Sequence, residues 1–230
     1  MINKKILVVA AHPDDEILGC GGTLIKYQKK GFKIKIIFLS DGESSRAISK
    51  KILNKLIIKR QTQAIKVSKN CKFLKPEFIN LPDNKLDSIP IINIIKKIED
   101  EIINFKPGIV FTHSQTDLNI DHQIACKAVT TATRPLSRTF VKSIFCFEVP
   151  SSTECNFSEY SNNFKPNYFE NITNSINFKL KTLKIYKSEI KQWPHARSLP
   201  GIKILSQFRG IQIGVKYAEA FNILRLLSEK

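Results

Sequence analysis

The sequence predicts an α/β protein whose parallel sheet is covered by helices on both faces. Two observations lead to this fold class. Short apolar runs alternate with longer helical segments, and the first run, residues 4–12, is apolar almost throughout. Strands that alternate with helices form parallel sheets through right-handed crossovers, and a continuous apolar run is typical of a strand buried on both faces. Because we find neither a domain boundary nor an internal repeat, we expect one domain over residues 1–230.

The individual elements follow from residue patterns in chain order. Apolar runs that mostly end in polar turns predict strands over residues 4–12, 32–42, 76–84, 107–114 and 143–152. A first helix is predicted to follow Pro13 and to run through residues 21–31. Amphipathic patterns predict further helices over residues 45–70, 89–106, 121–134, 177–190 and 217–228. Gly31 is the expected stop of the first helix. Residues 156–175 and 194–201 are expected to be loops.

The composition indicates a globular protein. Of the 230 residues, 42% are hydrophobic and 25% are charged, and no apolar run is long enough to span a bilayer. The apolar start is too short for a signal peptide and is followed by acids where a cleavage region would lie. Five widely spaced cysteines without a CxxC pair are typical of reduced core thiols. We therefore expect a cytoplasmic protein.

A formal net charge of +17 raises the question of nucleic-acid binding. The lysines are spread along the chain, and the sequence has no aromatic-interleaved basic motif, no P-loop and no GxGxxG after the first strand. A biased coding composition explains this spread, so no nucleic-acid partner is expected. A basic surface would still favour an anionic substrate or a membrane surface.

The stretch "VVAAHPDDEILGCGG", residues 8–22, concentrates unusual residues directly after the first strand. His12 and Asp15 are three residues apart and would project to one side of a helical first turn. An imidazole nitrogen and a carboxylate oxygen are both good zinc ligands. Asp14 would point elsewhere and be free to handle a proton. The simpler interpretation is a well-capped helix, with Pro13 at its first position and acids in its first turn.

A third ligand is available after the fourth strand. The segment "THSQTDLNIDHQ" contains His113, Asp117, Asp121 and His122, so three of the four histidines of the chain lie in two segments. Because ligands bind at the carboxyl ends of parallel strands, we expect the two segments to meet. Two histidines and one carboxylate, with a fourth position open to water, form a catalytic zinc arrangement.

With "AHPDDE" near the start and "DLNIDH" downstream, the chain resembles the LmbE/PIG-L family of zinc-dependent N-deacetylases. The segments "LSDGE", "LPDNKL", "FEVPSSTE", "PHARS" and "RGIQIGVKYAEAF" extend the resemblance over almost the whole chain. It implies a Rossmann-like three-layer fold, one divalent metal that is usually zinc, and hydrolysis of an acetamide on an amino-sugar conjugate such as one of N-acetylglucosamine.

The resemblance also implies roles for individual residues. His12, Asp15 and His122 match the metal ligands, Asp14 the general base, Asp121 an acid that orients a catalytic histidine, and Glu43, Arg60 and Asp83 sugar-contacting positions. His195 is a further candidate for contact with the substrate, or it hydrogen-bonds within its own loop. Arg60 has the alternative of being an exposed helix cation, and Arg209 and Tyr217 are expected to be structural.

Two positions depart from the family pattern. Several relatives carry a histidine at the position of Asn119, and an acid is expected at the position of Gln63. Asn119 cannot titrate, so the proton donor is either Asp14 alone or His113, which ends the fourth strand. The alternative for His113 is that it orients the loop with Asp121 and His122.

The predicted function is zinc-dependent removal of the N-acetyl group from an amino-sugar conjugate, with acetate as a product. The rival is a non-catalytic metal- or sugar-binding α/β protein, but a binding protein has no need of the spare carboxylate of Asp14. The sequence leaves open the rest of the substrate, a divalent metal other than zinc, and a homo-oligomer.

Overall fold

The computed structural model describes residues 3–45, 49–135, 141–157 and 163–228. Its sheet has seven strands in the order β3-β2-β1-β4-β5-β7-β6. They are β1 (Lys5–Ala10), β2 (Lys33–Ser40), β3 (Glu77–Leu81), β4 (Ile109–His113), β5 (Ser143–Phe147), β6 (Tyr168–Asn171) and β7 (Ala218–Leu226). The first five are parallel to one another, and β7 runs antiparallel between β5 and β6. The predicted α/β class with a mainly parallel sheet is confirmed.

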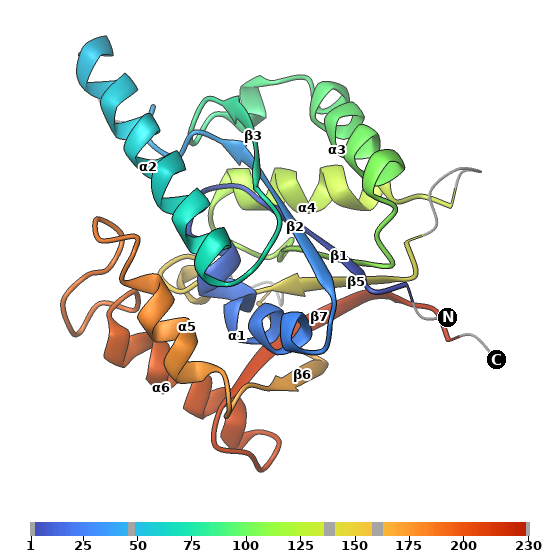
Figure 1. The fold of residues 1–230 in the computed structure, drawn as a ribbon, viewed down its shortest axis with the longest axis vertical. Helices are drawn as coiled ribbons and strands as arrows, with labels where there is room; N and C mark the ends of the chain where they lie inside the picture. The colour runs from blue at the N-terminus through green and yellow to red at the C-terminus, as the bar shows by residue number, and fades with distance from the viewer. Residues whose placement is uncertain (1–2, 46–48, 136–140, 158–162, 229–230) are drawn as a thin grey trace.

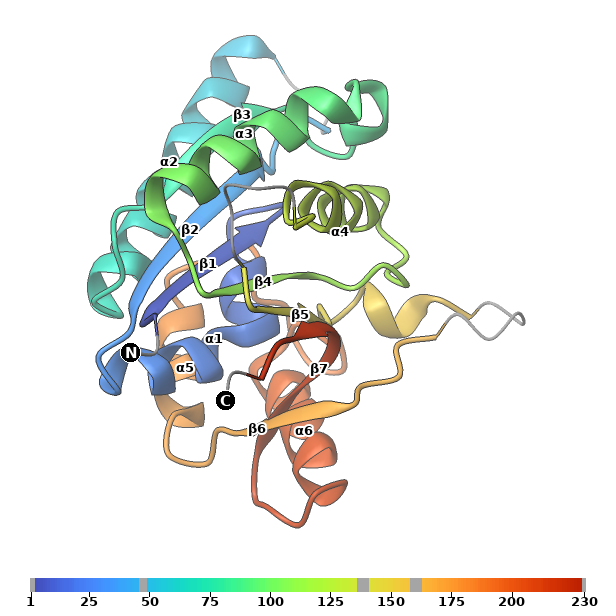
Figure 2. The same ribbon diagram turned by 90° about the vertical axis from the view of Figure 1, so that its right-hand side faces the viewer.

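Helices cover both faces of the sheet, which gives three layers (Figures 1 and 2). The helices are α1 (Asp15–Lys29), α2 (Lys50–Asn70), α3 (Ile91–Phe105), α4 (Ile120–Ala132), α5 (Ile176–Leu183) and α6 (Leu199–Ile211), with short 3₁₀ turns η1 (Leu86–Ser88) and η2 (Thr153–Cys155). One core cluster joins the sheet to α1, α2, α5 and α6, and the other joins it to α3 and α4.

Strand β1 shows why its apolar run is continuous. Ile6 and Val8 belong to the core cluster beneath α1, whereas Leu7 and Val9 belong to the cluster beneath α3 and α4. Successive side chains of a strand point to opposite faces, so a strand with two covered faces buries every position. Strand β1 therefore lies in the middle of the protein and its carboxyl end opens onto the edge where ligands bind.

The predicted closing helix over residues 217–228 is wrong, because this segment forms strand β7. Its Ala, Glu and Leu residues favour a helix locally. In the fold, Ala218–Phe221 is buried, and the strand pairs with β5 on one side and β6 on the other. Two ladders of backbone hydrogen bonds and burial outweigh a helix propensity of a few tenths of a kcal/mol per residue.

Other boundaries also differ from the expectation. Strand β6 lies within the predicted loop 156–175, part of which is outside the described residues, as are residues 46–48 of the predicted second helix. Helix α5 ends at Leu183, and α6 begins inside the predicted loop 194–201, where Ser198 caps it by accepting a hydrogen bond from the Gly201 N–H at 3.0 Å. Pro13 does not occupy the first helical position, because α1 begins at Asp15.

The cysteines and the helices can be compared with the compositional predictions. Cys20, Cys71, Cys126 and Cys146 are buried and Cys155 is partly buried, and all five are free thiols. Within the described ranges, no helix has the length and hydropathy needed to cross a bilayer.

Candidate active site

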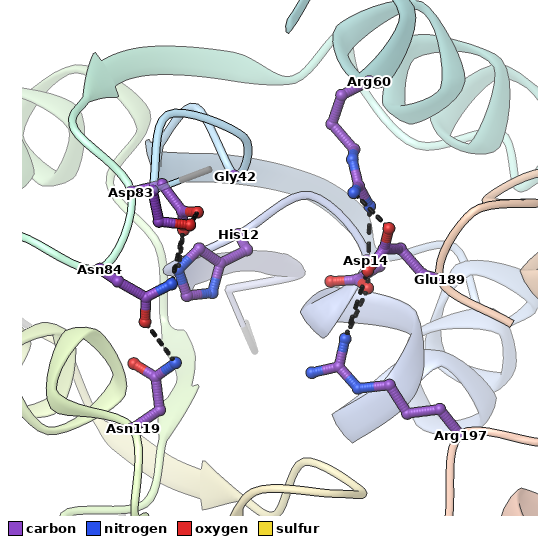
Figure 3. Close-up of a pocket in the computed structure, with 10 residues that line it drawn as sticks. His12, Asp14, Gly42, Arg60, Asp83, Asn84, Asn119, Glu189 and Arg197 are labelled. Atoms are coloured by element: carbon purple, nitrogen blue, oxygen red, sulfur yellow. Dashed lines mark hydrogen bonds and ion pairs between the residues drawn. The ribbon is translucent and has the colours of Figure 1, made fainter. Parts of the chain in front are cut away.

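A pocket of about 150 Å³ opens at the carboxyl ends of the parallel strands. Figure 3 shows two walls that face each other across it. One wall carries His12, Asp83, Asn84 and Asn119, and the other carries Asp14, Arg60, Glu189 and Arg197. Because these residues come from the loops after β1, β3 and β4, from helix α2 and from the C-terminal part of the chain, only the fold brings them together.

The predicted metal ligands converge next to this pocket. His12 Nδ1 lies 3.2 Å from Asp15 Oδ2, His122 Nε2 lies 3.3 Å from His12 Nδ1, and His122 Nε2 lies 3.4 Å from Asp15 Oδ2. A tetrahedral zinc site with bonds of about 2.0–2.1 Å places neighbouring ligand atoms about 3.3–3.4 Å apart. The three atoms therefore form a nearly regular triangle of the size that one zinc ion requires.

Two details of protonation agree with a cation at this position. The ring nitrogens of His12 and His122 face each other, so they cannot both carry a proton on these atoms. Asp15 Oδ1 is buried and accepts no hydrogen bond from the described residues. Burial alone would raise the pKa of Asp15, but His122 and His113 hold it well below its usual value, so this carboxylate is ionised. The residues present fit a divalent metal.

Neighbouring carboxylates orient the two histidines. His12 Nε2 lies 3.0 Å from Asp83 Oδ1 and 3.2 Å from Asp121 Oδ2, and His122 Nδ1 lies 3.1 Å from Asp117 Oδ2. A proton held on the outer nitrogen by a carboxylate leaves the inner nitrogen free to bind a metal. His12, Asp83 and Asp121 also satisfy the spacing of a metal site, but their contacts are explained by these hydrogen bonds.

Asp121 contacts His12, a candidate metal ligand, and its carboxylate also accepts the backbone N–H groups of Asn84 and Leu86 at 2.8 and 3.0 Å. The role implied by the resemblance, that Asp121 orients a catalytic histidine, stays a prediction. The acid next to His122 is Asp117, which the sequence analysis noted without a role. The nearby His122 ring and the hydroxyl donors Ser152 and Thr153 outweigh burial and lower the pKa of Asp117 to about 2.

Asp14 is held apart from the metal ligands in an unusual backbone conformation. Its φ of 141° is one that residues other than glycine rarely adopt. The Asp14 N–H donates to Glu16 Oε2 at 2.9 Å, and Glu16 accepts the Tyr186 hydroxyl at 2.7 Å, so buried side chains maintain this geometry. Burial raises the pKa of Asp14 to about 7, against the lowering effect of Arg197. A carboxylate with a pKa near neutrality suits proton transfer.

Arg60 and Glu43 form a pair behind Asp14. The Arg60 side chain is 3% exposed, so the alternative of a surface cation is wrong. Its Nε and Nη2 donate to Glu43 Oε1 at 3.0 and 2.8 Å, Nη2 also donates to Glu189, and Nη1 donates to the Pro13 carbonyl at 3.3 Å. Because Glu43 is buried beside Arg60 and its carboxylate faces the guanidinium, the structure gives it a supporting position.

Two further predicted residues, His113 and His195, lie outside the pocket. His113 is fully buried and stacks on His122 with ring centroids 3.9 Å apart, and its Nε2 accepts the Ala11 N–H at 2.8 Å. Burial lowers the pKa of His113 well below its usual value, and the ring lies outside the pocket. His195 is exposed, and its Nδ1 accepts the backbone N–H of Arg197.

Arg197 is a pocket residue that the sequence did not predict. It lies two positions after His195, the predicted substrate contact in "PHARS". Its Nη1 donates to Asp14 Oδ2 at 3.1 Å. Glu16 was not predicted to have a role although it ends the motif "AHPDDE", and no local pattern distinguishes Glu189 from other glutamates.

Residues 7–133 match the sequence model of the family described as GlcNAc-PI de-N-acetylase, PIG-L. The chain belongs to this family. The matched part contains all three candidate metal ligands and Asp14, and it ends before Arg197. The resemblance carried by the two sequence motifs is thereby confirmed.

Curated relatives extend the similarity. The chain is 24% identical over 229 residues to a diacetylchitobiose deacetylase of Thermococcus kodakarensis, covering 96% of this chain and 83% of the relative. It is 27% identical over 191 residues to an uncharacterized deacetylase of Escherichia coli, covering 80% and 91% of the two chains.

Solved structures share the fold. An N,N'-diacetylchitobiose deacetylase of Pyrococcus horikoshii matches with a TM-score of 0.77 and 22% identity, over 96% of this chain and 84% of the other. GalB of Pseudomonas putida, a 4-carboxy-2-hydroxymuconate hydratase, matches with a TM-score of 0.75 and 18% identity, over 98% of both chains. Since a hydratase shares this fold, the reaction of this chain has to be argued from its site.

Proposed function

We propose that this protein is a zinc-dependent N-deacetylase that releases acetate from an N-acetylglucosamine-type amino-sugar conjugate. One observation carries the proposal: the triangle of metal ligands borders, through His12, the pocket that the uncoordinated carboxylate of Asp14 also lines. A site that only stores a metal has no use for that carboxylate. The named deacetylases among the relatives support the same reaction class.

The metal would be held by His12 Nδ1, Asp15 Oδ2 and His122 Nε2. When bound, zinc lowers the pKa of a coordinated water to about 7 and polarises a carbonyl oxygen. Divalent metals that prefer oxygen ligands, such as magnesium and calcium, are less suited to a ligand set with two imidazoles. Asp83, Asp117 and Asp121 keep the two imidazoles oriented through close polar contacts with their outer nitrogens.

Asp14 handles the protons of the reaction. It removes a proton from the attacking water and returns one to the departing sugar nitrogen, so that the amine leaves in a neutral form. On the opposite wall, Asn119 stands at the position where several relatives carry a histidine, and its side chain cannot titrate. Asn119 caps helix α4 by accepting the Asp121 N–H and donates to Asn84 Oδ1 at 3.1 Å. Asp14 therefore serves as both base and acid.

The sugar binds between the two walls. Asp83, Asn84 and Asn119 offer carboxylate and amide groups for hydroxyl groups of the ring. Arg60, for which direct sugar contact was expected, acts instead by placing positive charge 3.9 Å from Asp14 Oδ2.

The test is acetate release from a panel of N-acetylglucosaminyl conjugates, comparing the wild-type protein with Asp14→Asn. The amide cannot accept a proton, so we expect turnover to fall about 100- to 10,000-fold while zinc content and the folded state are retained. Near-normal turnover of this variant would exclude Asp14 as the base. A wild-type protein that binds zinc and sugar but releases no acetate would support the binding-protein alternative.

A further inference from the structure

Arg197 connects three parts of the protein at the edge of the pocket. It lies just before Ser198, the N-cap of helix α6. Its Nε donates to Ser151 Oγ at 2.8 Å and to the Pro150 carbonyl at 3.2 Å, both in the loop after β5. Its Nη1 donates to Asp14 Oδ2 at 3.1 Å. The guanidinium group is therefore fixed at both ends, and the side chain is 18% exposed.

Both arginines near Asp14 approach the same carboxylate oxygen. Arg60 Nη1 lies 3.9 Å from Oδ2, which Arg197 also contacts. Among the residues that the structure describes, none donates a hydrogen bond to Asp14 Oδ1. Figure 3 shows Asp14 with Arg60 and Arg197 on either side. The two oxygens of the carboxylate are thus distinguished: one is bound by arginine and the other is left for the substrate side.

We propose that Arg197 is a positioning residue, which orients the Asp14 carboxylate so that Oδ1 is the oxygen that exchanges protons. This inference rests on the function proposed above and assigns a role to a residue outside the part of the chain that matches the family.

Arg197 rather than Arg60 sets the orientation. The N–H groups of Arg60 are directed to Glu43, Glu189 and the Pro13 carbonyl. Its distance of 3.9 Å from Asp14 is too long for a hydrogen bond. Arg197 donates a direct, charge-assisted hydrogen bond to Asp14 from Nη1, while its Nε donates to the loop after β5. A lysine at this position would carry all of its N–H donors on one nitrogen, which could not reach the loop and Asp14 in the way that two separate guanidinium nitrogens do.

Orientation matters here because Asp14 works alone. With Asn119 on the opposite wall, one carboxylate must accept the proton of water and deliver it to the leaving nitrogen. A carboxylate that rotates away loses both steps, and a misplacement of about 1 Å can cost about 100-fold in rate. Arg197 prevents that rotation without contacting the sugar itself.

The catalytic test compares Arg197→Met, Arg197→Ala and Arg197→Lys with the wild-type enzyme. We expect kcat to fall about 10- to 100-fold in all three, with KM and zinc content unchanged. Guanidinium ion at millimolar concentration should restore part of the activity of Arg197→Ala, whereas urea at the same concentration should not. A variant with normal kcat and raised KM would overturn the proposal, because Arg197 would then bind substrate.

Arg209→Met is the matched control. Arg209 makes a similar pair with a carboxylate, Nη2 to Glu148 Oε2 at 2.6 Å, but does not line the pocket. We expect unchanged kcat and no response to guanidinium. A loss of kcat equal to that of Arg197→Met would show that breaking any such pair lowers activity, which would also overturn the proposal.

A measurement without turnover separates this inference from the proposed function. In a double-mutant cycle of Asp14→Asn and Arg197→Met, followed by denaturant unfolding of the zinc-free protein, the two changes should be coupled. We expect the coupling to change the unfolding equilibrium constant by between about 2- and 100-fold. Additive effects would mean that Arg197 does not hold Asp14, whether or not the wild-type protein proves to be a deacetylase.

Discussion

At the scale of single residues, each histidine of the candidate metal site has its own carboxylate partner. Asp117 faces His122 Nδ1, whereas Asp83 and Asp121 face His12 Nε2. These contacts select the tautomers that direct His12 Nδ1 and His122 Nε2 toward Asp15. The ligand set therefore depends on residues that never contact the metal.

The first residue-scale prediction concerns Asp117→Asn. The amide oxygen is a weaker acceptor for the His122 ring, so we expect zinc affinity to fall about 10- to 100-fold. Competition with a chelator measures this change. Asp87→Asn, at an exposed aspartate of η1, is the control and should bind zinc as the wild-type protein does. Equal affinities for all three proteins would show that Asp117 does not support His122.

At the scale of elements, helix α1 packs unusually close to strand β5. A Cβ at Gly19 would lie 2.2 Å from Phe147 Cδ2, and one at Gly22 would lie 2.9 Å from two carbons of Ile172. The glycines of "GCGG" therefore allow the helix that follows the site to lie against the sheet, and this close approach determines where Asp14 and Asp15 stand.

We predict that Gly19→Ala destabilises the fold. Alanine gains about 1 kcal/mol of helix propensity, but overpacking against Phe147 costs about 1–3 kcal/mol, so the free energy of unfolding should fall by up to about 2 kcal/mol. Denaturant unfolding measures this. In a Phe147→Leu background the same substitution should cost less, and a more stable Gly19→Ala protein would contradict the close packing.

Strand β6 is joined to helix α1 through Glu170. Its carboxylate accepts the Tyr27 and Tyr168 hydroxyls at 2.8 and 2.6 Å and pairs with Lys26. Burial would raise the pKa of Glu170, but Lys26 and the two tyrosines lower it overall. Because the folded-state pKa lies below the unfolded one, this group stabilises the fold above the unfolded pKa of about 4.3.

We therefore predict a pH-dependent effect of Glu170→Gln. The variant should be less stable than the wild-type protein by about 1–3 kcal/mol at neutral pH, since charge-assisted hydrogen bonds are lost. This difference should shrink as the pH falls below about 4, because the Glu170 carboxylate of the unfolded chain is protonated first and that of the folded protein follows at its lower pKa. Denaturant unfolding at pH 7 and pH 3.5 measures it, and a difference that does not change with pH would contradict the ionised network.

At the scale of the whole molecule, the site joins distant parts of the chain. His12 and Asp15 lie at the β1–α1 junction, His122 lies in α4, and Arg197 precedes α6. Figure 1 shows that α1 and α4 cover opposite faces of the sheet. A metal that binds these ligands only in the folded state must stabilise the whole fold.

Zinc should therefore raise the melting temperature. At a free concentration about 100 times the dissociation constant, binding adds about 2.7 kcal/mol, or roughly 5–10 °C for a protein of this size. Thermal scans with zinc and with a chelator measure the shift. Magnesium should give none, because it prefers oxygen ligands. His12→Ala and His122→Ala should lose the zinc shift, and retention of a full shift in both would exclude this ligand set.

The sequence by itself determined the parallel part of the sheet and the candidate metal ligands. The buried run of β1 and the alternation of strands and helices are local patterns, and parallel strands necessarily end at one edge. His12 and Asp15 are three residues apart, so their proximity needs only one helical turn. The position of His122 followed from the strand-end rule, and its motif identified the family.

Only the tertiary structure decided the C-terminal part and the surroundings of Asp14. Residues 218–226 have a helical composition and become a strand because β5 and β6 offer backbone partners on both sides. Arg197 and Asp14 are 183 positions apart, and no local pattern links them. His113 ends a strand at the active edge, yet the stacked His122 covers it. Contacts between distant segments depend on how the layers pack, and packing is a property of the complete fold.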